Sequence, residues 1–209
     1  MSAIPNVLII GDSISMGYTP GVRRRLEGVA EVHRCDGNAR FTGFGLDHLE
    51  EWLTAPGKEL DIIHFNFGLH DIVPGNWGRS EPTGDDRQVL REEYEENLRL
   101  IVRRLKRACR CLVWATTTPV PPGNLTPPRR SGDEVEYNAI ALRVMSEAEV
   151  DIDDLYAFAL PILSSIQKAE DVHYTDEGYE VLAEAVSANI LTQIRRLNPE
   201  RTRSTHCNN

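Results

Sequence analysis

A serine and a histidine at opposite ends of the chain are the residues best suited to do chemistry. Ser13 ends the turn Gly11-Asp12-Ser13, directly after the apolar run 7–10. An apolar strand that ends in such a turn presents one hydroxyl at the carboxyl edge of a sheet, where open α/β sheets bind their ligands. A serine becomes a useful nucleophile when a base takes its proton, and His173 is suited to that. The sequence therefore predicts Ser13 as a nucleophile and His173 as its base.

Two further polar groups follow predicted strands and could bind the substrate or stabilise a developing negative charge. Gly37 and Asn38 lie in a Gly/Asn-rich loop after the strand predicted at 30–34, and His70-Asp71 follows the strand predicted at 60–67. Backbone donors near Ser13 and Gly37, with a side chain from the end of the third strand, could cradle an oxyanion. A carboxylate one turn before His173 could hold the imidazole ring.

The elements that must position these groups alternate along the chain. Strands are predicted at 7–10, 30–34, 60–67, 112–117 and 150–155, with helices at 16–26, 46–53, 88–109, 134–149 and 161–169 and a last helix capped by Thr175. Such alternation is typical of parallel strands with right-handed crossovers and helices on both faces. We expect a three-layer α/β/α fold with a mainly parallel five-stranded sheet, as one domain over 1–197, and a disordered polar tail at 198–209.

Composition narrows the classes of function. The formal net charge is -9, from 23 basic and 32 acidic residues among 209. A negative chain is a poor general binder of nucleic acid or anionic membranes, so neither is an expected partner. The four cysteines show no metal-site spacing, and no signal peptide or membrane-spanning run is recognisable. These features predict reduced thiols and a cytoplasmic location. No Gly-rich nucleotide loop is present, and no cofactor is expected.

The order of the polar motifs resembles the SGNH (or GDSL) hydrolase family. That family has Gly-Asp-Ser near its start, a glycine loop after the second strand, Gly-x-Asn-Asp after the third and Asp-x-x-His near its end. The matching segments here are Gly11-Asp12-Ser13, the Gly37 region, Gly68-Leu69-His70-Asp71 and Glu170-Asp171-Val172-His173. The resemblance runs from Val7 to about Leu197. Each motif alone is weakly specific, whereas four in the same order are a strong match.

Three departures from the family pattern leave residue roles open. His70 replaces the oxyanion asparagine, and an imidazole donates only in the correct tautomer or when protonated. Either Gly37 or Asn38 could supply the backbone amide of the second motif. Glu170 stands three residues before His173, where the family has aspartate, and that spacing suits one tight turn. We therefore expect Glu170 to orient His173, because the side chain of Asp171 should diverge from the imidazole. The longer arm of glutamate leaves an alternative, in which Asp171 or a backbone carbonyl holds the ring.

The resemblance implies a serine esterase acting through an acyl-enzyme on Ser13. Its substrates would be small acyl esters, such as acetyl groups on carbohydrates or related metabolites, and the sequence indicates no oligomeric state. One alternative is a metal-dependent hydrolase with Asp12, His70, Asp71 and His173 as ligands of zinc or manganese. Another is a binding module that kept the fold and lost turnover. Loops expected to overhang the site carry Trp77, Arg79, Arg129 and Arg130.

Overall fold

The centre of the molecule is a five-stranded parallel sheet. The computed structural model describes residues 4–75 and 88–198, and the strand order is β2-β1-β3-β4-β5. The strands are β1 (Asn6–Ile10), β2 (Glu31–Arg34), β3 (Leu60–Phe65), β4 (Cys109–Ala115) and β5 (Asp151–Asp153). Every neighbouring pair is parallel. The predicted five-stranded parallel sheet is thereby confirmed.

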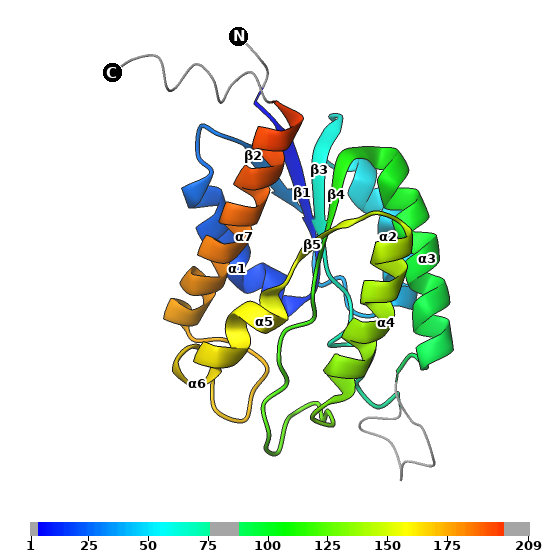
Figure 1. The fold of residues 1–209 in the computed structure, drawn as a ribbon, viewed down its shortest axis with the longest axis vertical. Helices are drawn as coiled ribbons and strands as arrows, with labels where there is room; N and C mark the ends of the chain where they lie inside the picture. The colour runs from blue at the N-terminus through cyan, green and yellow to red at the C-terminus, as the bar shows by residue number, and fades with distance from the viewer. Residues whose placement is uncertain (1–3, 76–87, 199–209) are drawn as a thin grey trace.

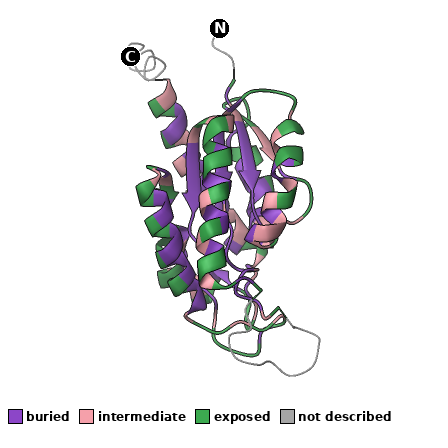
Figure 2. Ribbon diagram, turned by 90° about the vertical axis from the view of Figure 1, so that its right-hand side faces the viewer, coloured by how far each residue is buried: buried purple, intermediate pink, exposed green. Residues whose placement is uncertain are grey.

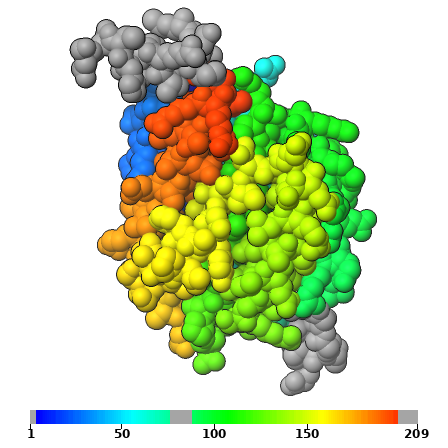
Figure 3. All heavy atoms as spheres, viewed as in Figure 1, coloured from blue at the N-terminus to red at the C-terminus, as the bar shows by residue number. Residues whose placement is uncertain are grey.

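Helices cover both faces of this sheet (Figure 1). On one face lie α1 (Ser13–Arg25) and α7 (Asp176–Leu197); on the other lie α2 (Thr42–Thr54), α3 (Arg91–Ala108) and α4 (Asp133–Glu147). The short helices α5 (Leu155–Ala159), η1 (Leu160–Ile162) and α6 (Leu163–Ile166) connect β5 to α7. In the space-filling view α7, the yellow β5–α6 segment and α4 lie side by side (Figure 3). None of the helices in the two described ranges is long and apolar enough to cross a membrane.

The core explains why β1 is apolar from Val7 to Ile10. Val7, Ile9 and Ile10 are fully buried and Leu8 is 1% exposed, because β1 has a strand on each side and a helix layer on each face. The buried strands lie between helices whose exposed sides face outward (Figure 2). Helix α3 buries one stripe of side chains: Tyr94, Leu98, Ile101 and Leu105 are all fully buried.

Several helix boundaries differ from the prediction, and side-chain caps explain two of them. α1 begins at Ser13 rather than at 16, because the Asp12 carboxylate accepts a hydrogen bond from Ile14 N–H (2.9 Å). The chain becomes helical at Leu155 rather than at 161, because Asp154 caps α5 through Ala157 N–H (3.0 Å). Thr175 caps α7 as predicted. Residues 199–209 of the predicted tail lie outside the described part of the chain.

Close packing of α1 against α7 brings residues from the early and late parts of the sequence together. A Cβ added to Gly17 of α1 would lie 2.1 Å from a ring carbon of Tyr179 in α7, and one added to Gly21 would lie 2.6 Å from the Ala183 side chain. Only glycine permits this approach, which places the first residue of α1 beside the loop that precedes α7. Those two positions carry Ser13 and His173.

Candidate active site

Ser13, His173 and Asp171 form a hydrogen-bonded chain. Ser13 Oγ lies 2.8 Å from His173 Nε2, and His173 Nδ1 lies 2.7 Å from Asp171 Oδ1. Because Nδ1 faces a carboxylate, its proton is placed there and Nε2 is free to accept the serine proton. This is the arrangement of a nucleophile, a general base and a carboxylate that orients the base. The contact joins the serine and the histidine that sequence reasoning paired.

The expected partner of His173 was wrong. Asp171 Oδ1 also accepts the backbone N–H of His173 (3.0 Å), so the aspartate folds back on the second residue after it. Glu170 is exposed, has a left-handed backbone (φ 50°), and its Oε1 accepts a long hydrogen bond from Asn124 N–H (3.4 Å). This left-handed turn directs the two neighbouring carboxylates apart, which sends Glu170 to the β4–α4 loop and Asp171 to the imidazole.

The histidine–aspartate pair is open to solvent and to a substrate. Both side chains are 38% exposed. Partial burial by itself would raise the pKa of Asp171, but the hydrogen bonds from the His173 backbone and ring outweigh burial and lower it. Asp171 is therefore a carboxylate at neutral pH, as the orienting role requires.

The nucleophile stands at the N-terminus of a helix that follows the central strand. Ser13 is the first residue of α1, so its N–H has no partner within the helix. Ser15 Oγ donates to the Asp12 carbonyl (2.7 Å) and tightens the same turn. Asp12 is 2% exposed and caps the helix, so it braces the turn instead of facing a substrate. The Ser13 N–H, which has no acceptor in the described ranges, and the positive end of the helix dipole both favour an anion beside Ser13.

The second loop resolves the choice between Gly37 and Asn38. The Gly37 N–H already donates to Asp36 Oδ1 (2.9 Å). The Asn38 N–H has no acceptor among the described residues, and the Asn38 side chain lies close to His70. Geometry therefore favours Asn38 over Gly37 as the backbone donor of this loop.

His70 faces the Asn38 side chain. Asn38 Oδ1 accepts the Arg40 N–H (2.8 Å), so its Nδ2 is the atom 3.5 Å from His70 Nε2. An amide nitrogen can only donate, which makes Nε2 an acceptor in this contact. Burial is the largest of the effects that lower the pKa of His70, so the ring is neutral near pH 7.

Asp71 lies beneath the site and faces no substrate. It is fully buried, and its Oδ1 accepts hydrogen bonds from Thr42 N–H (2.9 Å) and Thr42 Oγ1 (2.7 Å). Its predicted substrate-binding role is wrong, because the carboxyl group is enclosed at the N-terminus of α2. Burial raises the pKa of Asp71 to about 7.

Arg34, which sequence reasoning missed, joins the nucleophile turn to the second loop. Its Nη1 donates to the carbonyls of Cys35 (2.7 Å) and Gly37 (2.6 Å), and its Nη2 donates to the Gly11 carbonyl (2.9 Å). Nε and Nη2 also lie 3.3 and 3.2 Å from Ser15 Oγ. The one available signal was its position as the last residue of β2, beside the strand β1 that leads into the Ser13 turn.

The residues suggested as metal ligands do not converge. Asp12 caps α1, Asp71 is bonded to Thr42, and His173 is held between Ser13 and Asp171. Within residues 4–75 and 88–198, no three His, Cys, Asp or Glu side chains form a group that could hold a metal ion. The ligand set of the alternative hydrolase is therefore not assembled.

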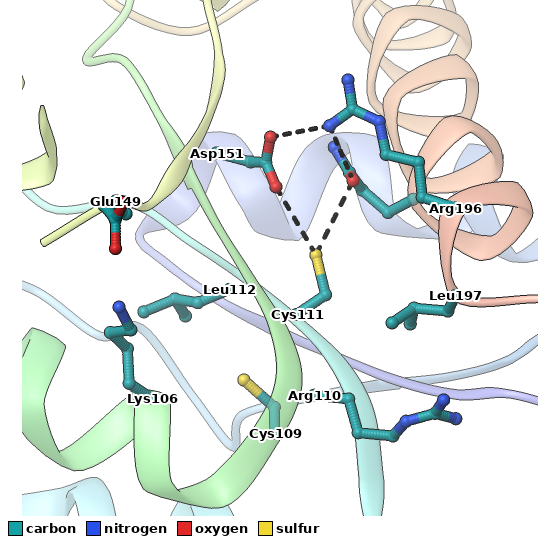
Figure 4. A pocket seen from close by; sticks show the side chains of 10 residues that line it. Lys106, Cys109, Arg110, Cys111, Leu112, Glu149, Asp151, Arg196 and Leu197 are labelled. Atoms are coloured by element: carbon teal, nitrogen blue, oxygen red, sulfur yellow. Dashed lines mark hydrogen bonds and ion pairs between the residues drawn. The ribbon is translucent and has the colours of Figure 1, made fainter.

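Two other polar features lie away from Ser13. His64 is fully buried on β3 with Nε2 2.9 Å from Asp153 Oδ2, so it is a paired core histidine. A pocket of about 370 Å³ opens near the start of β4, at the opposite end of that strand (Figure 4). Burial raises the pKa of Cys109 to about 12 and that of Cys111 to about 11, so these lining thiols are poor nucleophiles at neutral pH.

Of the loop residues expected to overhang the site, Trp77 and Arg79 lie outside the described residues. Arg130 is exposed, whereas Arg129 is partly buried and its Nε donates to the Leu69 carbonyl (2.7 Å), next to His70. Arg129 is thus the member of this set that the described structure places at the site.

Solved structures with the same fold are distant in sequence. A lipase/acylhydrolase from Enterococcus faecalis is 19% identical, with a TM-score of 0.71 over 89% of this chain and 95% of that one. An acetyl xylan esterase from Geobacillus stearothermophilus, Axe2-W215I, is 20% identical, with a TM-score of 0.69 over 91% and 94%. LAE5, an alpha/beta hydrolase enzyme from the metagenome of Lake Arreo, Spain, is 17% identical, with a TM-score of 0.71 over 95% and 98%. These likenesses establish the fold.

No curated protein sequence matches the chain, but a family model does. The model of the GDSL-like Lipase/Acylhydrolase family matches residues 9–181, a span that includes Ser13, Asn38, His70, Asp171 and His173. The match covers most of the chain. This protein is a carboxylic ester hydrolase that belongs to the GDSL-like lipase/acylhydrolase (SGNH) family.

Proposed function

We propose that the protein is a serine esterase that removes small acyl groups, such as acetyl, from carbohydrates or related metabolites. The observation that carries this proposal is the chain of short contacts from Ser13 Oγ to His173 Nε2 (2.8 Å) and from His173 Nδ1 to Asp171 (2.7 Å). Such geometry activates a hydroxyl for attack on an ester carbonyl at neutral pH.

The reaction proceeds in two halves. Ser13 Oγ attacks the acyl carbon while its proton passes to His173 Nε2; the ester C–O bond then breaks and the alcohol leaves with that proton. A water molecule attacks the acyl-enzyme, His173 takes one of its protons, and collapse of the second tetrahedral intermediate returns that proton to Ser13 Oγ as the acid is released. Asp171 stabilises the imidazolium that forms in each half.

The oxyanion of each intermediate is stabilised by backbone and side-chain N–H groups. Among the described residues, neither the Ser13 N–H at the start of α1 nor the Asn38 N–H has an acceptor. The Asn38 side-chain amide is the third donor, since one of its protons faces His70 and the other is available. In this proposal His70 orients Asn38 and does not itself contact the substrate, in contrast to the role expected from the sequence.

The structural neighbours support the choice of small acyl groups. Acetyl xylan esterases are among the structural neighbours, and their substrates are the basis for suggesting carbohydrate esters here.

Covalent labelling tests the proposal directly. A fluorophosphonate should modify wild-type protein at Ser13, with or without a chelator, and wild type should hydrolyse p-nitrophenyl acetate and acetylated sugars. Ser13→Ala should remain folded and lose several orders of magnitude in kcat. Wild-type turnover in Ser13→Ala, or activity that a chelator abolishes and zinc restores, contradicts the proposal.

A further inference from the structure

Arg129 is a partly buried cation beside the site, and one of its terminal nitrogens, Nη2, has no acceptor among the described residues. Its Nε donates to the Leu69 carbonyl (2.7 Å) and its Nη1 to the Pro127 carbonyl (3.2 Å). Among the described residues, no acceptor lies against its Nη2 and no carboxylate lies within ion-pair distance. A desolvated charge without a carboxylate partner is costly to keep. The two carbonyls therefore hold the guanidinium in place without neutralising it.

The contact with the Leu69 carbonyl places this cation next to His70, and its charge acts on the reacting groups. After burial, the largest effects on the pKa of Arg129 come from Asp12 and Asp171, the residues beside Ser13 and His173. Arg129 in turn contributes to the lowered pKa of His70, after burial and against the opposing charge of Asp12. Its loop contacts the segment before His173 as well, since Asn124 N–H donates to Glu170 Oε1 (3.4 Å). Both segments lie at the same end of the sheet (Figure 1).

Arg40, the other arginine that influences His70, is less suited to bind a substrate anion. It is exposed, and its guanidinium carbon lies 4.8 Å above the centre of the Phe44 ring. An exposed cation already stacked on an aromatic ring is well solvated and gains little from a second partner. Arg129 is partly desolvated and held by two backbone carbonyls, so an anion there would meet a fixed donor.

We propose that Arg129 binds a carboxylate on the substrate, so that the preferred esters are acetylated hydroxy acids, such as acidic sugars. The inference rests on the proposed function, because an acetyl group has no position for a charge and the carboxylate must then belong to the alcohol. A planar guanidinium pairs with a carboxylate more tightly than with a neutral hydroxyl.

A matched pair of acetyl esters tests this preference. 3-Acetoxybenzoate and its methyl ester differ only in the charged group, and the ratio of their kcat/KM values measures the preference. Arg129→Met should lower that ratio by about ten- to a hundredfold, the effect of losing one charged hydrogen bond. Arg103→Met, which removes an exposed charge from α3, should leave the ratio unchanged. Comparing ratios between variants cancels the intrinsic reactivity of the two esters.

Two further variants keep the test decisive if Arg129→Met folds poorly. Arg129→Lys keeps the charge and should retain part of the preference, whereas Arg129→Gln keeps donors for the carbonyls and should lose it. An equal ratio in wild type, Arg129→Lys and Arg129→Gln overturns the proposal. A preference confined to the acyl side, measured with p-nitrophenyl hemiglutarate against p-nitrophenyl butyrate, also overturns it.

A binding measurement distinguishes failure of this inference from failure of the proposed function. In Ser13→Ala, titration calorimetry should show tighter binding of 3-acetoxybenzoate than of its methyl ester, and Arg129→Gln in the same background should abolish the difference. A binding preference without wild-type turnover supports the inference and contradicts the esterase proposal. Turnover of both esters without any preference supports the esterase and overturns the inference.

Discussion

Asp171 Oδ1 accepts two hydrogen bonds from the same residue, one from the His173 backbone N–H at 3.0 Å and one from its Nδ1 at 2.7 Å. The pair is therefore a closed local unit, in which the carboxylate fixes both the backbone and the ring of the histidine. A glutamate three residues before the histidine is not needed to complete it. Glu170, directed toward Asn124, stabilises the neighbouring loop instead.

This geometry predicts opposite effects for the two adjacent acidic residues. Asp171→Asn should lower kcat by up to about 10⁴, because an amide cannot hold the imidazole in the correct tautomer or stabilise the imidazolium. Glu170→Gln, the matched control, should stay within about threefold of wild type, since it is exposed and makes one long hydrogen bond. Steady-state kcat for p-nitrophenyl acetate decides between them. A larger loss in Glu170→Gln would restore the three-residue spacing as the functional one.

The sheet and its ligand edge could be predicted because each depends on a strong, repeated signal. The apolar run of β1 and the stripe of α3 each satisfy many contacts at once, so a local pattern fixed their place in the fold. Ser13 and His173 could be paired because both elements end at the same edge of the sheet. The boundaries of the helix predicted at 161–169 could not, since one Asp154 cap moved its start.

The residue roles that were predicted wrongly each depend on the conformation of one residue. A sequence pattern does not determine such a backbone angle or side-chain direction. The left-handed φ of Glu170 decides which carboxylate meets His173, and non-glycine residues adopt that region rarely. The Asp36 side chain occupies the Gly37 N–H, which leaves Asn38 as the available donor. Arg34 acts mainly through backbone carbonyl oxygens, which every residue has, so the sequence indicated little about its partners.

A double-mutant cycle will identify the oxyanion donor. If Asn38 donates and His70 orients it, Asn38→Ala should lower kcat by about 10²–10³, the usual loss for one donor, and His70→Ala by less. The double variant should then cost little more than Asn38→Ala alone, because the two residues act through one group. Single-turnover rates with p-nitrophenyl acetate measure the coupling. Additive losses, or a larger loss in His70→Ala, would return the donor role to His70.

Arg34 is predicted to position the nucleophile turn against the Asn38 loop. Arg34→Met should lower kcat by about ten- to a hundredfold with little change in KM, because carbonyls of both loops lose a shared donor and the donors shift relative to Ser13. Arg34→Lys should recover part of the loss. The matched control is Arg23→Met, since Arg23 is exposed and donates to the Val32 carbonyl (3.0 Å) away from the turn. Equal kcat in all three variants and wild type would leave Arg34 without this role.

Asp71 should make the stability of the protein depend on pH. Burial raises its pKa in the folded state to about 7, above the ordinary value of 3.8 that applies when the chain unfolds. Between these two values the folded protein binds more protons than the unfolded chain. Stability at this site is therefore greatest at low pH and falls as the pH rises through this window.

Asp71→Asn should remove that dependence. Asparagine can still accept both Thr42 hydrogen bonds through Oδ1, and it resembles the protonated acid, whose second oxygen has no partner among the described residues. Relative to wild type, the variant should gain up to about 4 kcal/mol at pH 8 and nothing near pH 4. Urea unfolding at both pH values measures the difference, with Asp47→Asn on the exposed side of α2 as the matched control. A variant less stable than wild type at pH 8 would mean that the Asp71 charge stabilises the N-terminus of α2 by more than its burial costs.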